Sequence, residues 1–147
     1  MKAYERILVA VDLEQESQGI IERAAAISSA AKVSVVHVVL PLSQAFYANG
    51  LGLVQPMVDL AKLEEEIIDK AMDDLSQYVS GVPSDGRIHY DVKKGDVVDT
   101  IVDTAKESQA DLIVLGSHGT SGIKLLLGST ANGVLHHAPC DTLMIKI

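Results

Sequence analysis

Short apolar segments of strand length alternate with segments of helical periodicity along the whole of this 147-residue chain. The strand-like segments span Arg6–Asp12, Val33–Leu40, Arg87–Lys93, Asp111–Leu115 and Thr142–Ile147. The segments between them repeat apolar residues at intervals of three or four, which predicts helices. These helices are expected over Ser17–Ala31, with Ser17 as N-cap, and over Pro56–Ser80, Asp96–Gln109 and Ser129–His137. Strands separated by helices must be mostly parallel, so the predicted fold class is α/β.

The residue pattern within each strand predicts its place in the sheet. A strand buried on both faces is apolar throughout, whereas an edge strand alternates apolar and polar residues. The first and fourth strands contain the continuously apolar runs ILVAV and LIVL, while Arg87–Lys93 and Thr142–Ile147 alternate. We therefore expect a single domain over residues 1–147, a doubly wound five-stranded parallel sheet of order 3-2-1-4-5 with helices on both faces. Ligands bind such Rossmann-like sheets at the switch point, here beside Asp12 and Gly116.

Composition excludes several classes of protein. Hydrophobic residues make up 48% of the chain, which excludes a disordered chain, and no apolar run is long enough to cross a bilayer. The formal net charge of −8 disfavours binding to nucleic acid or to an anionic membrane. The first residues lack a signal-peptide cleavage site and the chain has one cysteine, so we expect a cytoplasmic protein.

A glycine-rich segment after the fourth strand is the candidate ligand site. Residues 116–140 hold five of the eleven glycines, and residues 112–140 contain no Asp or Glu. Glycines let backbone N–H groups surround an anion, and Ser129 and Thr130 are expected where a helix N-terminus directs its free amides. The segment therefore predicts a phosphate site. It lacks the Gly-Lys-Ser/Thr ending of a P-loop, and the turn after the first strand lacks G-x-G-x-x-G.

Several motifs together resemble the nucleotide-binding universal stress proteins, and the resemblance covers the whole chain. They are the opening ILVAVD, the HV pair that ends at Val38, the approach ADLIVLGSHG, the GST that opens the last helix, and the ending HAPCDTLMI. The family signature is G-x-x-G, nine residues, then Gly followed by Ser or Thr. Here Gly116 and Gly119 are followed by only eight residues before Gly128 and Ser129.

The resemblance implies an ATP site at the switch point. Asp12 would bind the ribose, the Val38 backbone would read the adenine edge, and Leu115 with Gly116 would line the sugar. The expected phosphate ligands are Gly119, Gly128, Ser129 and Thr130, and Ala10 and His118 complete the candidate site. Mg²⁺ or Mn²⁺ would be held through the phosphates, because the loop offers no carboxylate. The resemblance also implies a homodimer through Thr142–Ile147, and Pro41–Gln55 is a candidate lid.

Some of these residues have structural interpretations as well. Asp12 could instead cap the turn that follows it, and His118 could be a solvated loop residue. We expect His37 to be a hydrogen-bonded core histidine and Cys140 to serve in packing. Gly133 lies inside a short helix, where glycine is unfavourable, and this predicts a close approach of that helix to the sheet.

Three functions are compatible with the sequence. The favoured one is a regulatory ATP-binding protein whose nucleotide changes the surface shown to a protein partner, with slow ATP hydrolysis at most. The second is an ATP-cleaving or nucleotidyl-transfer enzyme that uses Ser117, His118 and Lys124. The third is a dimeric scaffold that has lost ATP because its glycine loop is one residue short.

Overall fold

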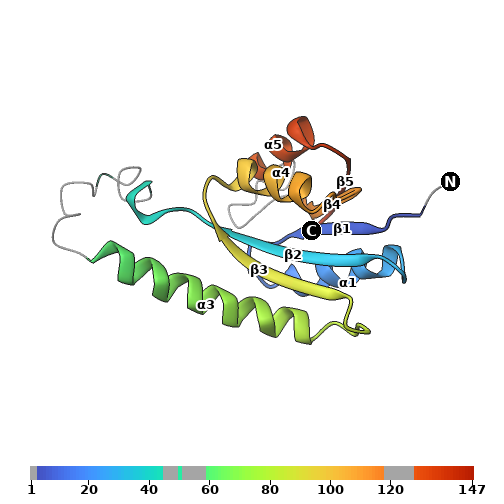
Figure 1. Cartoon of the computed structure of the whole chain (residues 1–147), viewed down its shortest axis with the longest axis horizontal. Coiled ribbons are helices and arrows are strands. Elements are labelled where there is room, and N and C mark those ends of the chain that lie inside the picture. The colour runs from blue at the N-terminus through green and yellow to red at the C-terminus, as the bar shows by residue number, and fades with distance from the viewer. Residues whose placement is uncertain (1–2, 45–49, 51–58, 118–127) are drawn as a thin grey trace.

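The computed structural model describes residues 3–44, 50, 59–117 and 128–147. Five parallel strands form one sheet of order β3-β2-β1-β4-β5, which confirms the predicted topology (Figure 1). In chain order the elements are β1 (Arg6–Ala10), α1 (Ser17–Ile27), β2 (Lys32–Val39), α3 (Leu60–Ser80), β3 (Ile88–Lys94), α4 (Val97–Glu107), β4 (Leu112–Gly116), α5 (Ser129–His137) and β5 (Asp141–Ile145).

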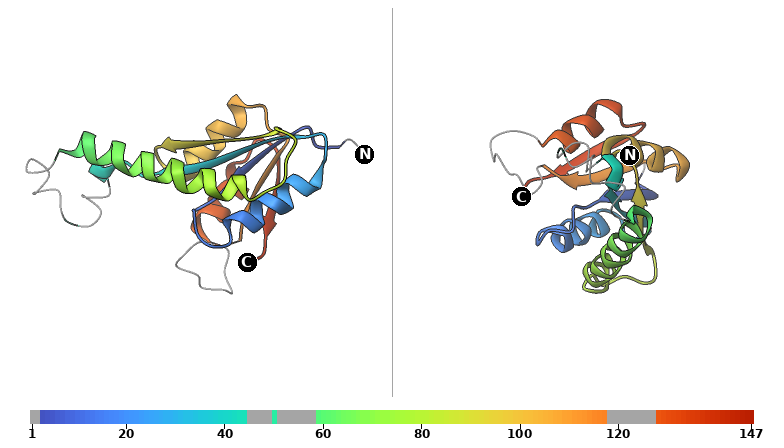
Figure 2. Two further views of the ribbon diagram at one scale, coloured as in Figure 1. Left: turned by 90° about the horizontal axis from the view of Figure 1, so that it is seen from below. Right: turned by 90° about the vertical axis from the view of Figure 1, so that its left-hand side faces the viewer.

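Two helices cover each face of the sheet, as the doubly wound arrangement requires (Figure 2). On one face α1 and α3 pack against the strands through buried residues that include Ile21 and Leu75. On the other face α4 and α5 do so through Ile101 and Val134. Of the described residues, none belongs to a helix that is long and apolar enough to cross a membrane.

Burial along the strands agrees with the predicted centre and edges of the sheet. In β1 every residue after Arg6 is buried, and in β4 every residue before Gly116 is buried. The edge strands β3 and β5 are buried at one residue each, Val92 and Ile145. The alternation of apolar and polar residues therefore located the edges correctly, because only one face of an edge strand is well covered.

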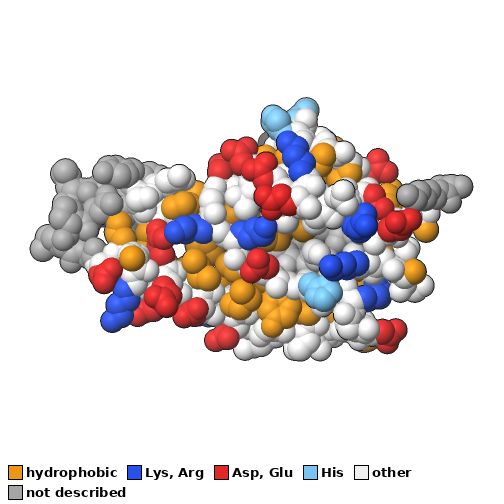
Figure 3. Space-filling view, in the orientation of Figure 1, with side chains coloured by type: hydrophobic (Ala, Val, Ile, Leu, Met, Phe, Trp, Pro, Cys, Tyr) orange, Lys and Arg blue, Asp and Glu red, His pale blue; other side chains and the backbone are white. Residues whose placement is uncertain are grey.

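The largest group of acidic residues lies on α3 and at its start. Seven acids fall between Asp59 and Asp74, and five of them are exposed. Figure 3 shows their carboxylates along the outer side of α3. This surface carries seven of the twenty acidic residues, and residues 112–140 carry none of them.

Two helices end differently from prediction because side chains cap them. The carboxylate of Asp59 accepts a hydrogen bond of 3.2 Å from the Lys62 amide, so α3 begins at Leu60. The predicted start of this helix, Pro56, lies outside the described residues. Helix α1 ends at Ile27 rather than Ala31. At this end the Arg87 guanidinium donates hydrogen bonds to three carbonyl oxygens. One belongs to Ala25, in the last turn of α1, and two belong to Ser28 and Ala31, which follow the helix.

The prediction that Ser17 is the N-cap of α1 was wrong. Glu16 occupies the N-cap position, and its side chain makes no capping bond. Ser17 is the first helical residue and is fully buried, and its Oγ has no hydrogen-bond partner among the described residues. The strand ends also shift: β1 stops at Ala10 rather than Asp12, and β4 and β5 are Leu112–Gly116 and Asp141–Ile145.

Gly133 permits a close helix contact, but the contact is with another helix. A Cβ on Gly133 would lie 2.7 Å from Cγ2 of Val98, which belongs to α4. The predicted approach to the sheet was therefore wrong. Glycine is needed because α4 and α5 lie side by side on the same face of the sheet, as Figure 1 shows.

Candidate functional site

The carboxyl ends of β1, β2 and β4 bring three of the predicted site residues together. Ala10 is the last β1 residue to pair on either side, with Val36 of β2 and Leu115 of β4. Ala10, Val38 and Leu115 belong to the same buried cluster as Ala131 of α5. The candidate site therefore combines the ends of three adjacent strands with the first turn of α5.

Asp12 follows β1 at this edge and caps the turn that it begins. Its side chain is exposed, and its Oδ1 accepts a hydrogen bond of 3.0 Å from the Glu14 amide. The structural interpretation of Asp12 is thus correct, and one carboxylate oxygen is engaged in this bond. Capping holds the carboxylate at the switch point, so it does not conflict with a ligand contact through Oδ2.

Two neighbouring contacts fix the same turn. Leu13 has a φ of 64°, a conformation that non-glycine residues seldom adopt. The hydroxyl of Tyr78, from α3, donates a hydrogen bond of 3.1 Å to the Leu13 carbonyl oxygen. No local sequence pattern marks this contact, because Tyr78 lies 65 residues further along the chain.

His37 of β2 contacts Val11, the residue that directly follows β1. Its ring Nδ1 lies 2.8 Å from the carbonyl oxygen of Val11, and the ring is half-buried. The predicted hydrogen bond is confirmed, but the ring is only half-buried and is not part of the core. The Val11 amide donates to the Val36 carbonyl oxygen at 3.0 Å, so both backbone groups of Val11 are bonded to β2.

The two ends of the glycine-rich loop are joined next to β4. The Ser117 amide donates to the Ile145 carbonyl oxygen at 2.9 Å, and the Gly128 amide donates to the Ser117 carbonyl oxygen at 2.8 Å. Gly128 is the N-cap of α5 and provides no side-chain cap, so Ser129 and Thr130 open a helix whose first amides lack such a partner. His118 and Gly119 lie outside the described residues.

The segment that follows β2 is anchored by a carboxylate of α3, which the sequence analysis missed. Glu64 accepts a hydrogen bond of 2.8 Å from the Leu42 amide and one of 2.9 Å from Lys94 Nζ. These two hydrogen bonds lower the pKa of Glu64, and the bond from Lys94 contributes most. Of the candidate lid Pro41–Gln55, residues 45–49 and 51–55 lie outside the described residues.

Cys140 has the properties of a packing residue. It is partly buried against the cluster of α4 and α5, and desolvation raises the pKa of its thiol. The carboxylates of Asp141 and Asp111 raise that pKa further. The thiol therefore stays protonated near neutral pH. Across the described ranges, no three His, Cys, Asp or Glu side chains are grouped so that they could hold a metal ion.

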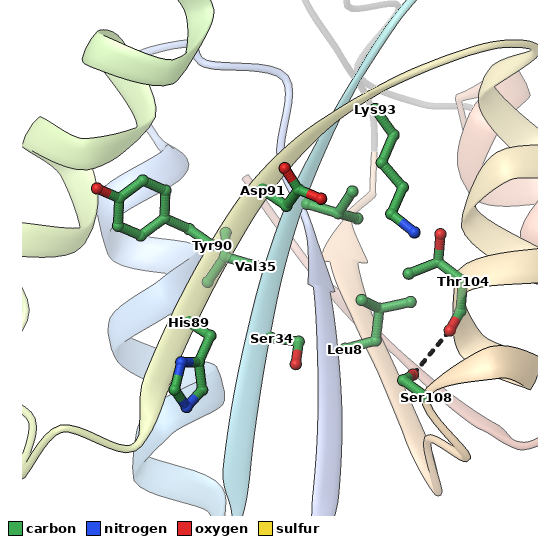
Figure 4. Close-up of a pocket in the computed structure, with 10 residues that line it drawn as sticks. Leu8, Ser34, Val35, His89, Tyr90, Asp91, Lys93, Thr104 and Ser108 are labelled. Atoms are coloured by element: carbon green, nitrogen blue, oxygen red, sulfur yellow. Dashed lines mark hydrogen bonds between the residues drawn. The ribbon is translucent and has the colours of Figure 1, made fainter.

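A hollow of about 200 Å³ lies away from the switch point, between β3 and α4 (Figure 4). Asp91 and Lys93 extend into it from β3, and they face Thr104 of α4 and Ser108, which directly follows α4. Both of these hydroxyls donate to carbonyl oxygens of α4, Thr104 to Thr100 and Ser108 to Thr104. The hollow contains none of the predicted site residues.

Comparison with known proteins identifies the family. The Universal stress protein family matches residues 3–146. The chain belongs to this family. It is 38% identical over 150 residues to Universal stress protein A homolog 2 of Coxiella burnetii, an alignment that covers 100% of this chain and 98% of that protein.

Two solved structures of the family share the fold. Universal stress protein UspA from Lactobacillus plantarum is 28% identical with a TM-score of 0.70, and the match covers 99% of each chain. A universal stress protein in complex with cAMP is 27% identical with a TM-score of 0.61, and the match covers 99% of this chain and 98% of that one. A member of this family therefore binds an adenine nucleotide.

Proposed function

We propose that this universal stress protein binds ATP at the carboxyl ends of β1, β2 and β4 and acts as a regulator. The observation that carries the proposal is the hydrogen bond from the Gly128 amide to the Ser117 carbonyl oxygen. It holds the start of α5, which has no side-chain cap, beside the strand ends that bear Ala10 and Leu115. An anion is the natural partner of such a helix start.

The described residues suit the parts of a nucleotide. Asp12 is exposed at the edge of the sheet, where its Oδ2 can accept a hydrogen bond from a ribose hydroxyl. Val38 offers backbone groups to the base, and the apolar side chains of Ala10 and Leu115 lie on the same face. The backbone of Gly116 would line the sugar, because the space beside its Cα on the other face is filled by the side chains of Ile147 and Ile20.

The phosphates belong at the start of α5 and in the glycine loop. Gly128, Ser129 and Thr130 supply amides and hydroxyls, and Gly119 with His118 would complete the loop contacts. Residues 112–140 bring no carboxylate to oppose the phosphates. For the same reason Mg²⁺ or Mn²⁺ would be bound by the phosphate oxygens rather than by this segment.

A substitution at the start of α5 separates nucleotide binding from folding. Ser129→Asp places a negative charge where the helix dipole favours it, so the protein should keep its stability. The same charge repels phosphate, and ATP affinity should fall tenfold or more. Gln77→Glu, on the exposed side of α3, adds the same charge elsewhere and should bind ATP like the wild type. ATP is titrated by calorimetry into protein from which any nucleotide has been stripped.

The stripped wild-type protein also distinguishes the alternative functions. No binding of ATP by the wild type would contradict the proposal and leave the scaffold hypothesis. Binding with little turnover supports a regulator. Rapid turnover that depends on a second substrate would instead support the enzyme hypothesis, in which Ser117 contacts the transition state.

We also propose that the protein is a homodimer through β5. This edge strand exposes Leu143, whose relative exposure is 40%, and an uncovered strand edge can pair with a second copy. The interface would include residues Thr142 to Ile147. Sedimentation at micromolar concentration should give a dimer mass, and Leu143→Asp should give a monomer. A monomer mass for the wild type would contradict this arrangement.

A further inference from the structure

The hydrogen-bond ladder between β1 and β2 lacks its last expected bond, the one from the Val38 amide to the Val11 carbonyl oxygen. Paired residues run from Arg6 with Lys32 to Ala10 with Val36, and the Val11 amide still donates to the Val36 carbonyl oxygen. In a parallel ladder the next bond would run from the Val38 amide to the Val11 carbonyl oxygen. That bond is absent, and the pairing ends at Ala10.

The side chain of His37 takes the place of the missing donor. Its Nδ1 lies 2.8 Å from the Val11 carbonyl oxygen, and a carbonyl oxygen can only accept, so Nδ1 carries the proton. The Val11 oxygen is therefore bonded even though the strands separate here. Separation of the strands leaves no backbone group of Val11 without a partner.

The backbone of Val38 is the group that this exchange releases. Backbone groups of successive strand residues are directed to opposite neighbours, so Val38 is directed to the same side as Val36, toward β1. The groups of Val39 are directed to β3, and its carbonyl oxygen accepts from the Gly95 amide at 3.0 Å. Among the described residues, the amide of Val38 finds no partner on the β1 side.

We propose that His37 is a positioning residue that opens the sheet at Val38, so that the Val38 amide and carbonyl oxygen bind the edge of an adenine base. This role rests on the proposed ATP site. An amide and a carbonyl oxygen on one side of a strand match adenine, which offers the ring nitrogen N1 as acceptor and the 6-amino group as donor. Guanine reverses this pattern, with a donor at N1 and an acceptor at O6. His37 thus sets the preference for adenine without touching the base.

Three variants test the role. His37→Asn keeps a donor, because its amide nitrogen is as many bonds from Cβ as Nδ1 is, and should keep the bond to Val11. His37→Val removes the donor and suits a strand, so the Val38 amide should move to the Val11 carbonyl oxygen. His89→Val makes the same change on the exposed edge strand β3 and serves as the matched control.

Hydrogen exchange of the Val38 amide, followed by NMR without nucleotide, tests the opened ladder directly. Exchange should be fast in the wild type, in His37→Asn and in His89→Val, and at least tenfold slower in His37→Val. Slow exchange in the wild type, or equal exchange in all four proteins, would overturn the inference even if ATP binds.

Nucleotide titration then tests the consequence for the base. His37→Val should lose tenfold or more in affinity for ATP and little for GTP, while His37→Asn retains the preference for ATP. Equal losses for ATP and GTP in His37→Val would overturn the adenine preference assigned to His37. If the wild type binds no ATP but the exchange pattern is as expected, the proposed function fails together with the base contact, and the opening of the strands by His37 stands.

Discussion

The Tyr78 hydroxyl donates a hydrogen bond of 3.1 Å to the carbonyl oxygen of Leu13, which connects the last turns of α3 to the turn after β1. Leu13 is in the left-handed region, with a φ of 64°, and it directly follows Asp12. Together with the bond from Glu14 to the Asp12 carboxylate, this contact defines the shape of the turn. A helix on one face of the sheet thereby supports a residue of the candidate site.

Tyr78→Phe is expected to loosen this turn while it retains the packing of the ring. Loss of one hydrogen bond should lower the free energy of unfolding by about 1 kcal/mol. ATP affinity should fall as well, because Asp12 is no longer held in place. Urea denaturation and calorimetric titration measure the two effects. Tyr90→Phe, at an exposed residue, is the control, and equal behaviour of the two variants would contradict a role for Tyr78 in the turn.

Arg87→Met should destabilise the protein by about 2 kcal/mol or more, measured by urea denaturation. The half-buried guanidinium donates to three carbonyl oxygens, at 2.8 to 3.2 Å, at the end of α1. Removal of the guanidinium leaves those oxygens without this hydrogen-bond donor. Hydrogen bonds from a charged group contribute more to the free energy of unfolding than neutral ones. Arg23→Met, at an exposed position of α1, should have little effect. A similar loss in both variants would show that the capping contact contributes nothing specific.

Gly133→Ala tests the close contact between α5 and α4. Alanine favours a helix over glycine by about 1 kcal/mol, but the new methyl group would overlap Val98 and cost about 1 to 3 kcal/mol. We expect a net loss of stability in thermal and urea denaturation. The double variant Val98→Ala with Gly133→Ala should recover part of it. Additive losses in the double variant would mean that the two residues do not interact.

Glu64→Gln should reduce the dependence of stability on acidic pH. Hydrogen bonds from Lys94 and from the Leu42 amide lower the pKa of Glu64 in the folded protein below its ordinary value of 4.5. The unfolded chain therefore binds the proton more readily, and the stabilisation is full above pH 4.5 and is lost as the pH falls through the lowered pKa. Urea denaturation at pH 7 and below pH 4 should show a larger loss for the wild type than for Glu64→Gln. An equal loss in both proteins would assign the acid sensitivity to other carboxylates.

Sequence periodicity predicted the order of elements, the parallel sheet and its edges because these depend on local patterns of apolar residues. The predicted boundaries of α5 agree with the structure, from Ser129 to His137. The predicted start of α3 at Pro56 lies outside the described residues, and the capping carboxylate of Asp59, directly before Leu60, was not recognised. Periodicity also placed Ser17 at a helix start, but it could not show that the helix would bury this side chain rather than use it as a cap.

Asp12 and Gly116 were placed at the switch point by strand order alone, and the structure brings Ala10, Val38 and Leu115 to the same edge of the sheet. Their ligand contacts stay predictions, and His118 and Gly119 lie outside the described residues. The residues that the sequence analysis missed, such as Tyr78 and Glu64, support the site from another element. No local pattern marks them, because their partners are distant in the chain.

The sequence by itself determined the alternation of strands and helices, the central and edge strands, and the acid-free segment after β4, since each is written in the spacing of neighbouring residues. Only the tertiary structure decided that His37 bonds the Val11 carbonyl oxygen, that Arg87 caps α1 and that Gly133 admits Val98. These contacts depend on distances between side chains and backbone groups that become neighbours only when the sheet is assembled.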